Sequence, residues 1–109
     1  MIVTPKSDAK AVTDGWLNAG ATYVVLFIQT CRQNLLIWSD NENTAVLFPL
    51  SEFDVIDTSI PPNWVVSVDL TGSLVLGPER WMEDDFWDRY NEEEAAAIEL
   101  FEEERARMM

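Results

Sequence analysis

An α+β fold, in which an antiparallel sheet of about five or six strands carries C-terminal helices packed against it, is predicted by the sequence. The middle of the chain consists of short apolar or alternating runs separated by polar turns, as in strands, whereas the last third has helical periodicity. Hydrophobic residues make up 48% of the 109 residues, which is enough for one core without a disulfide or a structural metal. Because no repeat or low-complexity linker interrupts the sequence, we expect residues 1–109 to form a single domain.

The first twenty residues give the least specific pattern. Ser7 or Asp8 is a candidate N-cap for a short helix. Val12 and Trp16 lie four positions apart and would share one face of this helix, and Gly20 would end it. Trp16 is expected in the core.

A three-stranded meander is predicted in the first half of the chain. Residues 21–30 are almost continuously apolar and rich in β-branched and aromatic side chains, as in a central strand covered on both faces. The apolar runs 35–39 and 44–48 follow, after short polar links at 31–33 and 40–43. Links of this length favour antiparallel pairing of consecutive strands.

The segment after the meander is predicted to be extended and partly buried. Pro49 is expected to end the third strand, because proline donates no hydrogen bond to a ladder. Phe53, Val55 and Ile56 are then expected to face the core. Two adjacent prolines at 61–62 fix an extended crossing to the next element.

The strongest local pattern is a β-hairpin over residues 64–76. Apolar side chains at 64, 66, 68 and 70 alternate with those at 65, 67 and 69, so the two sets lie on opposite sides of a strand. Thr71-Gly72 is typical of a tight turn, and the residues that follow return as the partner strand.

Two helices are predicted at the C-terminus. The first covers residues 83–90. Asn91 is a strong N-cap for the second, and Glu94 occupies the capping-box position three residues later. The spacing of Ala97 and Phe101 gives the second helix an apolar face that is expected to dock on the sheet.

On the opposite side of the second helix, Glu103 and Arg107 have the favourable i,i+4 order for an ion pair. Such a pair on an exposed helix face contributes a few tenths of a kcal/mol to stability. We expect it to form.

The chain is strongly acidic, with 20 Asp and Glu against 7 Lys and Arg, a formal net charge of −13 and a pI near 4.1. Twelve of the acids but only four of the bases follow Gly77. This balance argues against binding to nucleic acid or to an anionic membrane, since both need positive surface. It favours a basic partner, with solubility alone as the simpler explanation.

The sequence also predicts a cytoplasmic location. No apolar run approaches the roughly 20 residues of a membrane-spanning helix. The N-terminal residues lack the basic-then-apolar layout of a signal peptide.

No arrangement of residues suited to catalysis is recognisable. The chain has no histidine and Cys31 is its single cysteine, which excludes a Ser-His-Asp triad, a Cys-His pair and a multi-cysteine metal site. Asp40, Glu42 and Asn43 resemble a fragment of a calcium loop, but the glycine and the distant glutamate of such a loop are missing. We therefore expect a protein that is not an enzyme and that needs no metal or other cofactor.

The candidate partner-binding residues are acidic and lie in two places. The first is a set that we call the C-terminal acidic set: Glu83, Asp84, Asp85, Asp88, Glu92, Glu99 and Glu103. The competing location is the turn with Asp40 and Glu42, because binding groups often lie on loops. Trp81 is expected to be half exposed, and Trp81 or Trp87 is expected to contact the partner, since interfaces favour aromatic anchors rimmed by charge. The alternatives are a merely solvated helix face and a tryptophan that fills the core.

Three groups of aromatic, glycine and proline residues stand as landmarks along the chain. They are Trp16-Leu17 with Gly20 and Tyr23, Phe53 with Ile56-Asp57 and Ile60-Pro61-Pro62 before Trp64, and Gly77-Pro78 with Trp81, Phe86-Trp87 and Tyr90 before the acidic helix. In this order they resemble small immunity proteins of bacterial polymorphic-toxin systems, including those of contact-dependent growth inhibition. The resemblance implies a small, acidic α+β protein that is resident in the cytoplasm.

The resemblance also implies a function, that of a toxin inhibitor. Such a protein binds its cognate toxin domain tightly and blocks the active site or the access of substrate. Many of these toxins are nucleases with basic clefts, and an acidic inhibitor is steered into such a cleft at a high association rate. Two alternatives stay open: a DNA-mimic or anti-restriction inhibitor, and a non-enzymatic adaptor or oligomer subunit.

Overall fold

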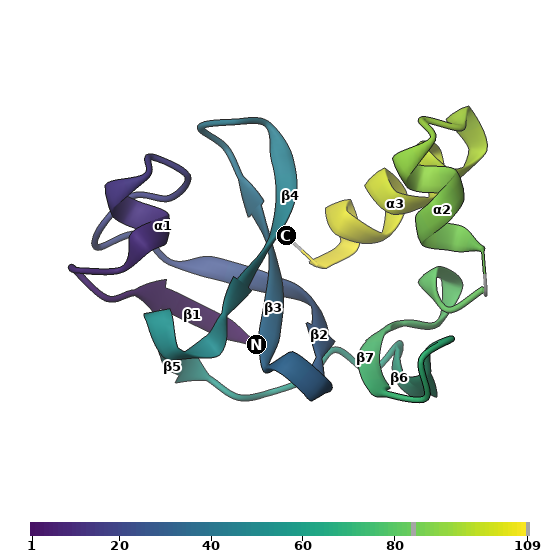
Figure 1. Cartoon of the computed structure of the whole chain (residues 1–109), viewed down its shortest axis with the longest axis horizontal. Coiled ribbons are helices and arrows are strands. Elements are labelled where there is room, and N and C mark those ends of the chain that lie inside the picture. Colours follow the sequence, from purple (N-terminus) through teal and green to yellow (C-terminus); the bar gives the residue numbers. More distant parts are fainter. Residues whose placement is uncertain (84, 109) are drawn as a thin grey trace.

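The computed structural model describes residues 1–83 and 85–108 and shows a seven-stranded sheet with helices packed on it (Figure 1). Every strand pair among these residues is antiparallel, so the predicted α+β fold is confirmed. The strands are β1 (Ile2–Pro5), β2 (Tyr23–Gln29), β3 (Asn34–Ser39), β4 (Thr44–Pro49), β5 (Phe53–Asp57), β6 (Trp64–Val68) and β7 (Leu74–Pro78). The helices are α1 (Lys10–Thr13), α2 (Phe86–Asn91) and α3 (Ala95–Met108), with single 3₁₀ turns η1 (Thr30–Arg32), η2 (Leu50–Glu52) and η3 (Glu79–Trp81).

β2 is the strand around which the sheet is organised. Along one edge it pairs with β3 between Val25 and Gln29, and β3 pairs in turn with β4. Its other edge is shared, because β1 pairs with Tyr23 and Val24 whereas β7 pairs with Ile28 and Gln29. β5 extends the sheet beyond β1, and β6 extends it beyond β7. The sheet therefore branches, and the β6–β7 hairpin lies at the end of the molecule that also carries α2 (Figure 1).

The predicted meander and the predicted hairpin are both present. β2, β3 and β4 pair in chain order, and β6 pairs with β7 from Trp64↔Pro78 to Val68↔Leu74. The hairpin turn is closed by Asp69, whose carboxylate accepts hydrogen bonds from the backbone N–H groups of Thr71 (2.9 Å) and Ser73 (3.0 Å). Apolar runs between polar links were sufficient to locate the meander, and alternation with the turn residues was sufficient to locate the hairpin.

A β-bulge in β2 turns two successive large side chains toward the helices. Val25 pairs with Ile37 and Phe27 pairs with Leu36, so Leu26 is the extra residue. Leu26 and Phe27 both pack in the apolar cluster that includes α2 and α3. Without the bulge they would face opposite sides of the sheet, because side chains alternate along a strand.

The sheet has a separate core on each face. Toward α1, a mainly aliphatic cluster is built from Val3, Ala11, Leu17, Val25, Leu35, Ile37, Phe48, Phe53 and Trp64. Toward α2 and α3, the cluster is dominated by aromatic rings. Trp81 stacks on Phe101, with centroids 4.8 Å apart, and on Phe86, with centroids 6.2 Å apart. These rings fix the C-terminal helices to the sheet.

The N-terminal segment differs most from the prediction. It begins with β1, which the sequence pattern did not indicate and which is held by pairing with both β2 and β5. The short helix α1 is present, but its N-cap is Ala9 and not Ser7 or Asp8. The helix is over before Gly15, whose φ of 82° turns the chain, so Gly20 does not end it.

β5 is an edge strand, and its position changes which of its side chains are buried. Phe53 is buried as predicted, but Val55 is 40% exposed and Ile56 is 57% exposed. The prediction that Val55 and Ile56 face the core is therefore wrong. Among the described strands β5 pairs with β1 alone, and its outward side chains meet solvent.

The connection between α2 and α3 also differs from the prediction. Asn91 is the last residue of α2 and not the N-cap of α3. Glu93 has a φ of 60°, in the left-handed region, and α3 begins only at Ala95. Residues 92–94 are used for the turn, so the predicted capping box between Asn91 and Glu94 does not form.

Candidate functional site

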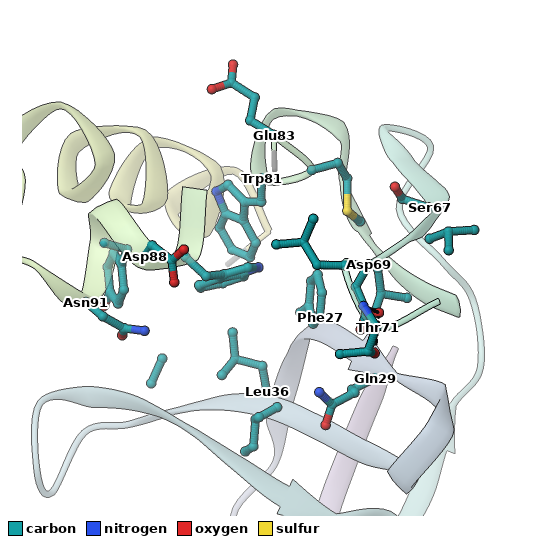
Figure 2. A pocket seen from close by; sticks show the side chains of 18 residues that line it. Phe27, Gln29, Leu36, Ser67, Asp69, Thr71, Trp81, Glu83, Asp88 and Asn91 are labelled. Atoms are coloured by element: carbon teal, nitrogen blue, oxygen red, sulfur yellow. Dashed lines mark hydrogen bonds between the residues drawn. The ribbon is translucent and has the colours of Figure 1, made fainter. Parts of the chain in front are cut away.

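An open groove of about 620 Å³ lies on the helix side of the sheet, between α2 and the β6–β7 hairpin (Figure 2). Its apolar lining consists of Phe27, Leu36, Ala45, Leu47, Val68, Leu70, Val75, Trp81, Met82, Trp87 and Tyr90. Its polar lining consists of Gln29, Ser67, Asp69, Thr71, Glu83, Asp88 and Asn91. A predominantly apolar hollow with a few polar groups is the usual form of a binding site.

The aromatic wall of the groove depends on a glycine from another strand. Trp87 meets Phe27 edge to face, with ring centroids 5.4 Å apart. A Cβ atom at Gly77 would lie 2.6 Å from Cδ2 of Phe27, so only glycine leaves room for this ring. The bulge at Leu26 and the glycine in β7 together place Phe27 in the groove.

Of the described residues, three with carboxylates line the groove: Asp69, Glu83 and Asp88. In Figure 2, Asp69 and Asp88 lie on different sides of it, whereas the carboxylate of Glu83 points away from its centre. The hydroxyl of Thr71 and the N–H of Ser73 donate to Asp69 and hold its pKa below the ordinary value of 3.8. Asp69 therefore carries its negative charge at neutral pH.

Tyr90 lines the groove as a neutral side chain, and its charged neighbours are Glu102 and Arg105. Burial raises the pKa of Tyr90 above its ordinary value of 10.0, and the charge of Glu102 raises it further while Arg105 partly offsets the effect. The hydroxyl therefore stays protonated at physiological pH.

Arg89 neutralises part of the C-terminal acidic set. It lies 3.1 Å from Glu83, 3.5 Å from Asp85 and 3.7 Å from Glu94. Its buried Nε atom makes no hydrogen bond with a described residue, so charge attraction alone relates it to Asp85. Exposed pairs of this kind contribute little to stability, but they reduce the negative charge that Glu83 and Asp85 present to a partner.

The predicted ion pair between Glu103 and Arg107 is wrong. Glu103 lies 2.9 Å from Arg80, and Arg107 binds Glu104 instead at 3.3 Å. Glu103 and Glu99 line a second, shallow hollow of about 390 Å³, and of the described residues Glu83 alone lines both this hollow and the groove. These two acids therefore face a surface other than the groove.

The C-terminal acidic set does not form one surface. Glu83 and Asp88 are its members that line the groove, and Asp88 is exposed with no ion pair to a described residue. Asp85 and Glu92 are exposed elsewhere. Asp84 lies outside the described residues.

The turn with Asp40 and Glu42 is a separate location. Both side chains are exposed. Their neighbour Asn41 donates hydrogen bonds to the Gly15 carbonyl and the Asn18 side chain, each at 3.1 Å. The turn is thus tied to the segment after α1 and lies apart from α2 (Figure 1). The structure does not join the two predicted sites.

The prediction that Trp81 is half exposed is wrong. Trp81 is 1% exposed, because Phe86 and Phe101 stack on it and its indole N–H donates to the Leu100 carbonyl at 3.5 Å. The tryptophan that the groove presents is Trp87, which is half-buried. Trp81 supports the groove and is not an anchor on the surface.

The apolar groove residues of the hairpin and of β4 were not identified as binding residues. The predicted alternation along residues 64–70 already placed Val68 and Leu70 on one side of the hairpin, which was a usable signal. Leu47 carried none, because it lies within a uniformly apolar strand and only its edge position leaves it 44% exposed.

Glu104 was also missed, and its role is structural. This buried carboxylate accepts hydrogen bonds from Asn63 (3.0 Å), Arg107 (3.3 Å) and Arg80 (3.4 Å). Its position three residues after Phe101 put it on the buried face of the helix, which was the available signal. Glu104 ties α3 to η3 and to the start of β6.

Within residues 1–83 and 85–108, no group of three or more His, Cys, Asp or Glu side chains is arranged to hold a metal ion. No helix in this part of the chain is both long and apolar enough to cross a membrane. Comparisons of the chain with protein-family models, with curated proteins and with solved structures find no match.

Proposed function

We propose that the protein is a bacterial immunity protein that binds a basic toxin domain in the cytoplasm and neutralises it. The observation that carries the proposal is the apolar groove beside α2 with the carboxylates of Asp69 and Asp88 on different sides. The order of landmarks along the sequence, which resembles that of such immunity proteins, supplies the biological class.

The groove and the net charge supply different parts of the interaction. Phe27, Leu47 and Trp87 offer apolar surface, whose burial stabilises a complex by roughly 25 cal/mol per Å² before the costs of association. The net charge of −13 raises the rate at which a basic protein arrives. We expect the partner to place an apolar side chain against Trp87 and basic side chains near Asp69 and Asp88.

The DNA-mimic alternative receives less support from the geometry. A mimic needs carboxylates that project together with their full charge, as phosphates do. Here Arg89 lies among three carboxylates and Arg80 lies against Glu103, so positive charge interrupts the array. The adaptor or oligomer alternative predicts self-association, which the molar mass in solution tests.

The experiment is protection of cells by variants of this protein against a basic toxin domain encoded by the neighbouring gene. Glu83→Lys combined with Asp88→Lys reverses two charges at the groove, and Asp40→Lys combined with Glu42→Lys makes the same change of charge at the distant turn. The groove variant should lose protection and bind the toxin at least about tenfold more slowly at low salt, whereas the turn variant should protect normally. Both should melt near the parent temperature, because exposed charges contribute little to stability.

Loss of protection in the turn variant alone would move the site to Asp40 and Glu42. Full protection by both variants would contradict the proposal that an acidic groove neutralises a basic toxin. A loss that comes from faster dissociation and not slower association would assign Glu83 or Asp88 a direct, buried contact with the partner.

A further inference from the structure

The outer edge of β6 has free backbone hydrogen-bonding groups. The register pairs Val65 with Gly77 and Ser67 with Val75, and beyond the strand Asp69 N–H donates to the Ser73 carbonyl at 2.9 Å. Because hydrogen-bonded and non-hydrogen-bonded pairs alternate in an antiparallel ladder, the odd-numbered residues of β6 bond to β7. The N–H and C=O groups of Val66 and Val68 therefore point away from β7. Among the described strands β6 pairs with β7 alone.

This edge lacks the features by which proteins usually block edge pairing. Proteins protect exposed edges with charged side chains, prolines or bulges. β5 carries two exposed aspartates and β4 ends in Pro49, whereas β6 has neither a charge nor a proline between Trp64 and Val68. Instead Val66 and Val68 are 62% and 60% exposed. The edge is apolar, open and made of strong strand formers.

The charge around the edge selects the kind of occupant. The β6–β7 hairpin, from Trp64 to Pro78, has one acidic residue, Asp69, and no lysine or arginine, and Glu79 follows it directly. A second copy of the chain would bring another −13 of charge to the same place, which opposes pairing of β6 with itself. A basic segment is attracted by the net charge of the chain and meets the carboxylate of Asp69 directly after β6.

We infer that the outer edge of β6 receives an extended, basic segment of the partner, which adds to the sheet as a further strand beside Val66 and Val68. The inference rests on the proposed function, because it names where the neutralised partner pairs with this chain. Val68, Leu70 and Thr71 of the same hairpin also line the groove, so a segment on this edge runs alongside it. Backbone hydrogen bonds give such a complex affinity, and neighbouring side chains give it specificity.

The test uses the blocked peptide Lys-Val-Lys-Val-Lys-Val-Lys and amide hydrogen exchange measured by NMR. In the free protein, the amides of Val66 and Val68 should exchange fast and those of Val65 and Ser67 slowly. The peptide should slow exchange at Val66 and Val68 by about tenfold or more, as for amides that enter a strand ladder. The same peptide with N-methyl groups along its backbone keeps the charge and should give no protection. A Glu-Val peptide should give none either.

Two substitutions distinguish the contribution of the backbone N–H of Val66 from that of its side chain. Val66→Pro removes the outward N–H while leaving the inward ladder to β7, and it should abolish the protection. Val66→Thr keeps the N–H and should preserve it. Circular dichroism of both variants shows whether the sheet is intact; if Val66→Pro unfolds the chain, the N-methylated peptide remains the deciding control.

Equal protection by the N-methylated peptide, or none by the basic peptide, would overturn the inference. So would slow exchange at Val66 and Val68 in the free protein together with a dimeric mass, which would make a second copy the occupant. If the toxin domain binds while these two amides stay fast in the complex, the edge is not used and the proposed function stands. If the basic peptide protects them but no toxin is neutralised, the edge binds strands and the proposed function fails.

Discussion

One face of the sheet is closed under α3 and open beside α2, although both halves carry apolar side chains. Under α3, Phe101 is fully buried, and its ring centroid lies 6.2 Å from that of Trp38. The guanidinium carbon of Arg105 lies 3.9 Å from the centroid of the Trp38 ring. Beside α2, Trp87 and Leu47 border the groove. α3 has 14 residues and α2 has 6, which correspond to lengths of about 21 Å and 9 Å.

The comparison indicates that helix length decides whether the apolar face of the sheet is buried in the fold or left open to a partner. A long helix covers its half of the face, and the buried side chains stabilise the fold. The short helix α2 covers only part of its half, and the uncovered side chains remain available to a partner. Changes in the closed half should therefore alter stability, and changes in the open half should alter binding.

The largest expected effect comes from opening the closed half. Phe101→Ala should lower the free energy of unfolding by about 3–5 kcal/mol, because it removes a fully buried ring that contacts Trp81 and Tyr90. Leu47→Ala, the matched truncation in the open half, should cost about 1 kcal/mol or less, since this side chain is 44% exposed. Urea denaturation of both variants is the measurement. Equal losses in the free energy of unfolding would show that side chains in the two halves contribute equally to stability.

A smaller effect should come from filling the space behind the groove. Gly77→Ala places a methyl group against Phe27 and should cost about 1–3 kcal/mol through overpacking. The displaced ring should change the fluorescence of Trp87, which it touches. Adding Phe27→Leu removes the clashing ring, so the double variant should lose less stability than the two single losses combined. If the two single losses of stability simply added in the double variant, the ring of Phe27 would not clash with a side chain at position 77.

The elements that the sequence predicted are those set by local periodicity. The meander follows from short apolar runs between polar links, and the hairpin follows from alternation and turn residues. β1 was missed because its four residues become a strand only by pairing with β2 and β5. Val55 and Ile56 were misplaced because an apolar pattern does not reveal that β5 lies at an edge. In each case the outcome depends on which distant segments of the chain pair with the strand.

The kinds of residue in the candidate site could be predicted from the sequence, but their arrangement in space could not. An acidic surface with aromatic side chains was expected, and Asp88 and Glu83 do line the groove. The groove itself joins residues from Phe27 to Asn91, so no spacing in the sequence indicates it. Trp81 was misjudged because its burial depends on stacking with Phe101, twenty positions later.

The smallest expected effect concerns pH and compares a groove carboxylate with one elsewhere. Asp69 accepts hydrogen bonds from Thr71 and Ser73, and Asp57 at the end of β5 accepts them from Ser59. These bonds, above all those from the Thr71 and Ser59 hydroxyls, lower the pKa of both carboxyls below 3.8. A lowered pKa in the folded state means that the stabilisation is complete above pH 3.8 and is lost as the pH falls through the folded-state pKa. Asp57 is exposed and Asp69 is partly exposed, so the loss should be local to their turns.

NMR titration should therefore show both carboxyls protonating below pH 3.8, with faster amide exchange at Thr71 and Ser73 as Asp69 protonates. Only Asp69 lines the groove, so Asp69→Asn should weaken binding of the partner at neutral pH while Asp57→Asn leaves it unchanged. The asparagine keeps a carbonyl that accepts the turn hydrogen bonds and removes only the charge. A difference in binding between these two variants then reports charge at the groove and not the loss of a turn. If Asp57→Asn weakened binding as much, the net charge of the whole chain, and not the position of its carboxylates, would govern recognition.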